Sequence, residues 1–340
     1  MKALVKYGPG SNGMSVQEVP EPIPQTGEIK IRVIAAGICG TDIHIMSDEY
    51  PYNPPVIMGH EYVGVVTELG SGVTGFKVGD NVVSLTAVKT CGSCRYCRDG
   101  LLMLCKDRLS IGSGVNGAFA EYLTVPARLA FKVPEEVVTV EEVAACEPLA
   151  CVVRSVVERA SVKAGDIVLV SGPGTIGLMA LQLAKVQGGY VIVSGTLQDE
   201  KRLELARELG ADITVSNPEE LLGTIKAINP YGVDVAFECA GAAGSADLCI
   251  KSLRKQGLYS QVGLFGKVIP IDMDLFLTKE VLITNSFATE ASSWEIALRL
   301  LKNNQIKLGS LISAKIPLAN WKDAFDMMLQ KQGYKILLIP

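Results

Sequence analysis

Residues 167–177 read Ile-Val-Leu-Val-Ser-Gly-Pro-Gly-Thr-Ile-Gly, an apolar run that ends in a cluster of glycines. The β-branched residues predict a buried strand over Ile167–Val170, and the apolar period that follows predicts a helix over Thr175–Val186. The intervening glycine turn has the spacing G-x-G-x-x-G, which lets backbone approach a pyrophosphate at a helix N-terminus. In this strand–turn–helix context it predicts a dinucleotide site that includes Gly172, Gly174, Thr175, Ile176 and Gly177.

Strand and helix patterns keep alternating after the glycine turn. We expect strands at 190–193, 213–215, 233–237 and 258–262, and helices at 201–209, 219–228 and 243–253. Such alternation is typical of an α/β fold with a doubly wound parallel sheet. The interval 151–287 is therefore predicted to be a dinucleotide-binding domain.

The chain has a different texture before residue 150. Short β-rich runs at 29–34, 62–68, 82–85 and 119–125 are separated by Gly, Pro and Asp, a pattern typical of an all-β, barrel-like unit. After residue 288 we expect helices at 294–301 and 321–329 and a last strand at 335–339. A chain of 340 residues is too long for one core. We therefore expect 1–150 and 288–340 to form one domain, with 151–287 inserted in it.

The composition is that of a folded globular protein, with 48% hydrophobic and 20% charged residues. A net charge of −4 without a basic cluster excludes nucleic acid as a partner. Glycines interrupt the longest apolar stretch, Ile167–Val186, so we expect no membrane span. The first residues, Met1–Tyr7, lack the apolar core of a signal peptide, and we expect a reducing cytoplasm.

Four cysteines between residues 91 and 105, the cysteine lobe, have metal-ligand spacing. Cys91, Cys94, Cys97 and Cys105 follow the pattern C-x2-C-x2-C-x7-C, which can close a tetrahedral zinc site of structural type. Disulfides are disfavoured in a reducing compartment, and an iron–sulfur cluster is disfavoured because the Cys-Pro ending of ferredoxin runs is missing. The other cysteines are expected to be small buried hydrophobes: Cys146, Cys151, Cys239 and Cys249.

Both histidines of the chain lie in short motifs in which a histidine can take part in metal or proton chemistry. Residues 39–44 read Cys-Gly-Thr-Asp-Ile-His, and residues 59–61 read Gly-His-Glu. Cys39, His60 and a carboxylate could supply three zinc ligands and leave a fourth position open, as catalytic zinc requires. The alternative is that His60 is a hydrogen-bonded core histidine and Cys39 a buried thiol.

The choice between NAD and NADP stays open at this stage. About 20 residues after the glycine turn, an acid usually binds the adenosine ribose of NAD. Here the strand runs into Ser194-Gly-Thr-Leu-Gln198, the first acids are Asp199 and Glu200, and Lys201 and Arg202 follow. This segment could meet either a ribose hydroxyl or a 2′-phosphate.

The motifs together resemble one family over the whole chain, the zinc-containing medium-chain dehydrogenases. The resemblance rests on the motifs at 39–44, 59–61 and 147–149, on the cysteine lobe and on the glycine turn. The polyol (sorbitol-type) and L-threonine 3-dehydrogenase branches look closest, because residue 147 is Glu where classical alcohol dehydrogenases have a zinc-binding Cys. The family implies a GroES-like catalytic domain with a Rossmann insertion. The segment 194–201 departs from the pattern, since it looks about two residues longer and lacks the usual acid.

The resemblance also implies roles for single residues. Cys39 and His60 would bind the catalytic zinc, with Glu61 or Glu147 as an exchangeable carboxylate ligand. Zinc lowers the pKa of the alcohol, whose proton passes through Thr41 and then His44 while hydride goes to the nicotinamide. Asp42 would orient a ligand or form the turn. Further cofactor contacts are expected from Thr196, Arg202 and Val262.

The implied enzyme oxidises a secondary alcohol with NAD or NADP and carries two zinc ions per subunit. A hard carboxylate ligand suits a substrate with two oxygens, so we expect a vicinal diol or polyol, with L-threonine second. We expect a homo-oligomer, a dimer or a tetramer. Two other classes remain open: a zinc-free quinone reductase of the same fold, and a non-catalytic nucleotide-binding protein that keeps its metals for stability.

Overall fold

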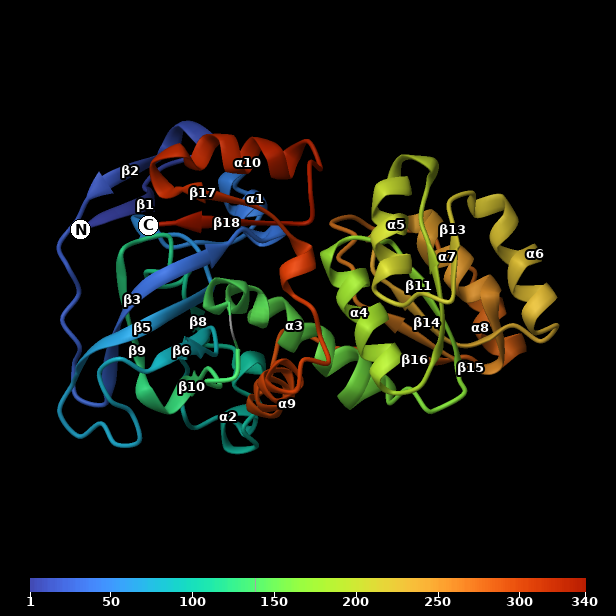
Figure 1. Cartoon of the computed structure of the whole chain (residues 1–340), viewed down its shortest axis with the longest axis horizontal. Coiled ribbons are helices and arrows are strands. Elements are labelled where there is room, and N and C mark those ends of the chain that lie inside the picture. Colours follow the sequence, from blue (N-terminus) through green and yellow to red (C-terminus); the bar gives the residue numbers. More distant parts are fainter. Residues whose placement is uncertain (138) are drawn as a thin grey trace. The chain divides into compact units, whose positions relative to one another are not determined.

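The computed structural model describes residues 1–137 and 139–340, and the chain divides into two compact units. The first consists of Met1–Ala150 and Thr289–Pro340, and the second of Cys151–Ala288. In Figure 1 the blue-to-green and red parts of the chain therefore belong to one unit, and the yellow-green to orange part to the other.

The second unit is built on a six-stranded parallel sheet with the order β13-β12-β11-β14-β15-β16. The order runs outward in both directions from β11 and β14, so a switch point lies between these two strands. The strands are β11 Ile167–Ser171, β12 Tyr190–Ser194, β13 Ile213–Val215, β14 Val233–Glu238, β15 Leu253–Gln261 and β16 Leu282–Asn285.

Helices cover this sheet because its strands are apolar on both faces. Val168, Leu169 and Val170 of β11 are all fully buried. The helices are α4 Thr175–Val186, α5 Glu200–Glu208, α6 Pro218–Ile228, α7 Ala243–Ser252 and α8 Met273–Lys279. The predicted doubly wound α/β fold is confirmed.

One predicted helix end is wrong. The sequence pattern extends a helix to Leu253, but α7 ends at Ser252 and Leu253 begins β15, where it pairs with Val233 of β14. The register of the pair shifts between Val233 and Val235. Leu253 is buried in the sheet core, and this tertiary pairing outweighs its local helical preference.

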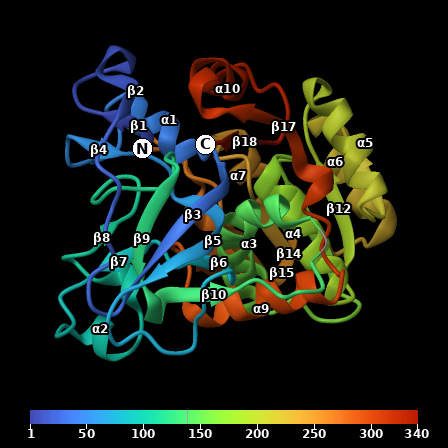
Figure 2. The ribbon, with the colours of Figure 1, turned by 60° about the vertical axis from the view of Figure 1, so that its left-hand side comes forward.

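The first unit is β-rich, with one large sheet ordered β10-β6-β5-β3-β18-β17, in which β9 also pairs with β3, and a small sheet ordered β2-β1-β4. Figure 2 shows β3 beside β5 and β9. The strands are β1 Lys2–Lys6, β2 Met14–Glu18, β3 Glu28–Gly37, β4 Val56–Ile57, β5 Glu61–Leu69, β6 Asn81–Ser84, β7 Ala87–Lys89, β8 Leu109–Ser110, β9 Tyr122–Pro126, β10 Ala130–Lys132, β17 Ile312–Pro317 and β18 Lys335–Ile339.

The last strand returns to the first part of the chain. Leu337 of β18 pairs with Gly37 of β3 in antiparallel register, and β17 pairs with β18. The helices of this unit are α1 Gly40–Met46, α2 Arg95–Arg98, α3 Cys146–Val153, which continues into the second unit, α9 Ala291–Lys302 and α10 Trp321–Leu329. Among the described residues, no helix is long and apolar enough to cross a membrane.

Candidate active site

Two neighbouring strands bring Cys39, His60 and Glu61 together. Gly37, the last residue of β3, pairs with Glu61, the first residue of β5. The chain leaves β3 for Cys39, the N-cap of α1, and enters β5 from His60. The ligand atoms of Cys39, His60 and Glu61 lie within 4.8 Å of one another. The spacing suits one metal ion held by a thiolate, an imidazole and a carboxylate.

Asp42 contacts both Cys39 and His60 of this candidate metal group. Its Oδ2 accepts the backbone amide of Cys39 at 2.9 Å and so caps α1, while its Oδ1 lies 3.6 Å from Nδ1 of His60. Burial is the largest single influence on the pKa of His60 and lowers it, but the charges of fully buried Asp42 and of Cys39 and their hydrogen bonds together hold that pKa well above its usual value. Asp42 therefore forms the turn and also faces His60, whose Nε2 is left to bind a metal.

Lys335 is a member of this site that the sequence did not reveal. Its ammonium lies 2.9 and 2.6 Å from the two carboxylate oxygens of Glu61, and it also donates to the carbonyl of Ile38 at 3.0 Å. Glu61 is fully buried and Lys335 is 4% exposed. Burial is the largest single influence on the pKa of Lys335 and lowers it, but the charge and hydrogen bond of Glu61, with the charges of Cys39 and Glu147, together raise that pKa above the usual value. The pairing of β18 with β3 places the lysine here, and no local pattern predicts that.

Glu147, the other predicted carboxylate, lies in the first turn of α3 and is 8% exposed. Within the described part of the chain, the three-residue group contains Glu61 and not Glu147. The charge of Glu147 nevertheless helps to raise the pKa of Lys335, so the carboxyl lies within electrostatic reach of the group. The geometry therefore favours Glu61 as the ligand in this conformation.

Thr41 and His44 lie three residues apart on α1 and so share one face of the helix. The hydroxyl of Thr41 is 3.7 Å from the sulfur of Cys39. The side chain of His44 is 47% exposed, and its Nδ1 lies 2.7 Å from a carboxylate oxygen of Glu49. The helix thus carries one polar side chain beside a candidate ligand and a second one in contact with solvent.

The cysteine lobe has the geometry of a closed zinc site. The four sulfurs lie within 4.8 Å of one another, and that of Cys91 is 3.9 Å from Cys97 and 3.6 Å from Cys105. Ligands at the zinc–sulfur bond length around a tetrahedral centre lie about 3.8 Å apart. The four thiols therefore fit a zinc ion.

The surroundings shift the pKa values of two of these thiols in opposite directions. Backbone amides of Ser93 and Cys94 donate to Cys91 and lower the pKa of its thiol to about 6. Desolvation, together with the thiols of Cys94 and Cys105, raises the pKa of Cys97 to about 11. Four adjacent thiolates repel one another unless a cation compensates their charge, which a bound zinc would do.

The remaining cysteines are less uniform than expected. Cys146 and Cys249 are buried, as the sequence predicts, but Cys151 and Cys239 are partly exposed. Cys151 lies on α3, and Cys239 directly follows β14.

The glycine turn joins β11 to α4 in the second unit. Gly172 has φ +102°, and a Cβ atom there would lie 2.8 Å from Cβ of Ala240. A Cβ on Gly177 would lie 1.9 Å from the carbonyl oxygen of Gly172, so only glycine allows the helix to pack this closely on the turn. Gly174 is the N-cap of α4, and Thr175 and Ile176 are the first residues of the helix, at the end where a phosphate is favoured.

The other predicted cofactor residues lie at the same edge of the sheet, because parallel strands have their carboxyl ends together. Thr196 follows β12, and Val262 follows β15, where its amide donates to the carbonyl of Glu238 at 2.9 Å. Arg202 lies on α5, and its guanidinium comes within 3.7 Å of a Cβ built on Gly174. The structure thus gathers the glycine turn, Thr196, Arg202 and Val262 along one edge.

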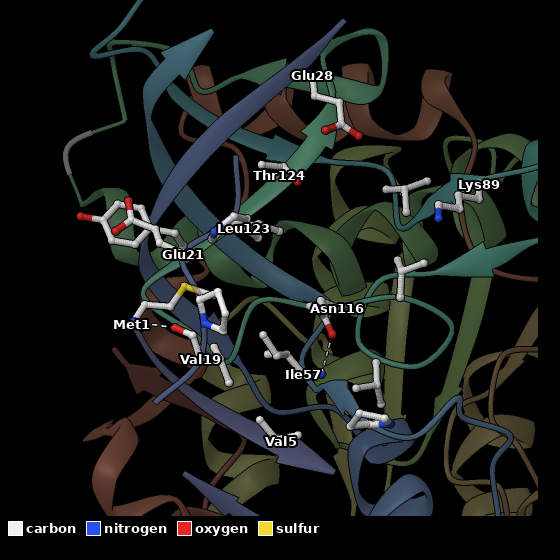
Figure 3. Close-up of a pocket in the computed structure, with 18 of the residues that line it drawn as sticks. Met1, Val5, Val19, Glu21, Glu28, Ile57, Lys89, Asn116, Leu123 and Thr124 are labelled. Atoms are coloured by element: carbon white, nitrogen blue, oxygen red, sulfur yellow. Dashed lines mark hydrogen bonds between the residues drawn. The ribbon is translucent and has the colours of Figure 1, made fainter. Parts of the chain in front are cut away.

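A separate cavity of about 590 Å³ lies in the first unit. Figure 3 shows apolar side chains such as Val5, Ile57 and Leu123 around it, and Asn116 accepts the amide of Ile57 at 3.0 Å. None of its lining residues belongs to the predicted metal or cofactor groups. The cavity is therefore distinct from the candidate active site.

Comparison with known proteins identifies the family. Residues 25–135 match the alcohol dehydrogenase GroES-like domain, and residues 175–303 match the zinc-binding dehydrogenase family. A sorbitol dehydrogenase from Halalkalibacterium halodurans is 39% identical over 345 residues, which cover 100% of this chain and 99% of the relative. The chain belongs to the zinc-dependent medium-chain dehydrogenases.

Further relatives of this dehydrogenase belong to the same enzyme class. A D-arabitol-phosphate dehydrogenase from Enterococcus avium is 35% identical over 99% of this chain and 97% of its own length. A solved structure from Sinorhizobium meliloti 1021, described as a zinc-binding dehydrogenase bound to NADP, is 32% identical with a TM-score of 0.90, and the match covers 100% of this chain and 99% of that one.

The dehydrogenase is thus an NAD(P)-linked, zinc-dependent enzyme that acts on alcohol groups. The family, the GroES-like and Rossmann-type folds and the enzyme class predicted from the sequence are confirmed. This outcome favours the dehydrogenase over the quinone reductase and over the non-catalytic nucleotide-binding protein. The individual site residues stay predictions.

Proposed function

We propose that this dehydrogenase oxidises a secondary hydroxyl of a vicinal diol or polyol and transfers hydride to NAD or NADP. The observation that carries the proposal is the mixed group of Cys39, His60 and Glu61, in which a buried carboxylate accompanies a single thiolate. An oxygen ligand makes a zinc site harder than two thiolates would, and a harder site suits a substrate that offers two oxygens. Two relatives named for sugar alcohols support the same class.

The residues present fit two zinc ions per subunit. Cys39, His60 and Glu61 would hold the catalytic ion, with Glu147 as a second carboxylate in reserve, and the cysteine lobe would hold the structural one. When bound at the first site, zinc supplies a Lewis acid that lowers the pKa of a substrate alcohol. Lys335 holds the carboxylate of Glu61 in place, and Asp42 orients His60.

The proton of the alcohol would leave through α1. The hydroxyl of Thr41, beside Cys39, would accept it and release its own proton, and His44 on the same helix face would take up the released proton and pass it to solvent. Glu49, 2.7 Å from Nδ1 of His44, fixes the orientation of the ring. The exposed position of His44 suits exchange with water.

The cofactor, assembly and compartment belong to the same proposal. NAD or NADP would bind with its pyrophosphate at the glycine turn and α4, and with further contacts from Thr196, Arg202 and Val262. We expect a homo-oligomer, a dimer or a tetramer. A cytoplasmic location would keep the four thiols of the lobe reduced for metal binding.

A substrate panel tests the proposal. The kcat/KM of sorbitol, other polyols, 2,3-butanediol, L-threonine and ethanol should be measured with NAD and with NADP. Vicinal diols or polyols should give the highest values, and L-threonine is the second candidate. If ethanol proves best while polyols and threonine stay at background, the reasoning from the carboxylate ligand is wrong.

A pair of variants tests whether residue 147 influences the substrate preference. Glu147→Cys should shift the preference toward simple alkanols, because a thiol at this position offers the zinc a second soft ligand. The matched control is Glu141→Gln in the preceding helical turn, Val140–Ala145, which should leave the ratio of polyol to ethanol activity unchanged. Equal ratios in both variants and the parent would show that Glu147 does not influence the substrate class.

A further inference from the structure

We propose that this enzyme selects NADP(H) over NAD(H), and that Arg202 is the residue that recognises the 2′-phosphate. The proposal rests on the proposed dinucleotide function and deepens it by naming the cofactor and a specificity-determining residue. It is carried by the geometry of residues 194–202, which connect β12 to α5 beside the glycine turn.

The position that usually holds a ribose-binding acid does not hold one here. Ser194, the last residue of β12, is 4% exposed, and its hydroxyl donates to that of Ser171 at 3.2 Å. At the next position, a Cβ on Gly195 would lie 3.0 Å from Cβ of Asp199 and 3.1 Å from Cγ of Pro173. These contacts are tighter than ordinary van der Waals distances, so the turn itself disfavours an Asp or Glu side chain at residue 195.

The next two acids make other interactions. Asp199 accepts the amide of Thr196 at 2.9 Å and its hydroxyl at 2.8 Å, in a capping box that starts the helical turn Leu197–Asp199. Glu200 forms an ion pair of 3.1 Å with Arg207, one and a half to two turns further along α5. Both acids are thus engaged in interactions that start and stabilise the helical segment.

A cation takes the place beside the turn instead. The nearest heavy atom to a Cβ built on Gly174 is Nη1 of Arg202, at 3.7 Å. Gly174 is the N-cap of α4, where the dinucleotide phosphates are expected, and Arg202 is partly buried there. A guanidinium suits a phosphate because it is always charged and donates several hydrogen bonds in one plane, and an arginine at this place accommodates the 2′-phosphate of NADP. Exposed Lys201 adds a second positive charge at the same helix start.

Direct binding tests the proposal without depending on zinc or on an alcohol. Isothermal titration of the purified enzyme with NADP⁺ and with NAD⁺ should give a Kd at least about 10-fold lower for NADP⁺, since charged hydrogen bonds to a phosphate carry this much discrimination. Arg202→Ala should weaken NADP⁺ binding about 10- to 100-fold and change NAD⁺ binding less than about 2-fold. The matched control Arg207→Ala, which removes a charge from the same helix, should leave both values unchanged.

The outcomes separate the cofactor choice from the enzyme class. If Arg202→Ala weakens both dinucleotides equally, Arg202 contacts a part common to both and the proposal is overturned. If the parent enzyme binds NAD⁺ as tightly as NADP⁺ or more tightly, the proposal also fails, while the dehydrogenase function stands. If neither dinucleotide binds, the nicotinamide-linked function fails together with the inference.

Discussion

Replacing Lys335 by Met should strongly destabilise the first unit. The ammonium of Lys335 contacts both oxygens of Glu61, which is fully buried, and in the metal-free protein the variant would leave that carboxylate without a cation. Removing one partner of a buried ion pair costs about 3–5 kcal/mol, far more than the pair contributes relative to an apolar pair of similar volume. Because about 1.4 kcal/mol corresponds to a factor of ten, the opening equilibrium should rise by about 10²- to 4 × 10³-fold.

Native-state hydrogen exchange measures this effect within the unit, without assuming that a protein of two units unfolds in one step. Amides of β3 and β5 should exchange about 10²- to 4 × 10³-fold faster in metal-free Lys335→Met, by the same energy scale. The double variant Glu61→Gln with Lys335→Met removes both charges and should recover most of the loss. The control Lys251→Met breaks an exposed pair with Asp247, which should cost less than about 1 kcal/mol.

Two results would contradict this reasoning. An effect of Lys335→Met no larger than that of Lys251→Met would mean that water or another cation compensates Glu61. A double variant as unstable as the single one would mean that packing of the lysine chain, and not the charge left behind, accounts for the loss.

The remaining predictions concern metals, the proton path and acid stability. Elemental mass spectrometry should find two zinc ions per subunit, and a ratio near one with full activity would contradict the two-site assignment. Cys94→Ser should lower the unfolding temperature more than it lowers turnover, whereas Cys39→Ser should lower turnover more than the unfolding temperature. His44→Ala should lower kcat at least about tenfold below about pH 7 and less at high pH, where hydroxide replaces the base, whereas a pH-independent loss would indicate a positioning role. The pKa of Asp48 is lowered from 3.8 to about 2 by hydrogen bonds from Tyr52 and Lys6. Its folded-state pKa lies below the unfolded value, so its stabilisation is present above pH 3.8 and is lost as the pH falls toward 2. Urea unfolding of Asp48→Asn at several pH values should show lower stability at pH 7 and a shallower acid dependence, and curves parallel to the parent would contradict this.

Local patterns were sufficient for much of this protein. The glycine turn and the strands and helices around it could be predicted because their apolar periods and turn residues lie within a few positions of one another. The cysteine lobe could be predicted for the same reason, since its four thiols lie between residues 91 and 105. The motifs at 39–44 and 59–61 contain typical metal-binding side chains, so both candidate metal groups could be recognised from the sequence alone.

Tertiary structure decided what joins these motifs. Lys335 contacts Glu61 although 274 positions separate them in the sequence. The pairing of β18 with β3 places this first residue of β18 in the core, beside Glu61. The pairing of β3 with β5, in which Gly37 lies opposite Glu61, places Glu61 rather than Glu147 in the three-residue group. The position of Arg202 beside Gly174 likewise depends on how α5 packs after β12. Such contacts follow from strand pairing and packing over long sequence separations, which a periodicity of two or 3.6 residues does not encode.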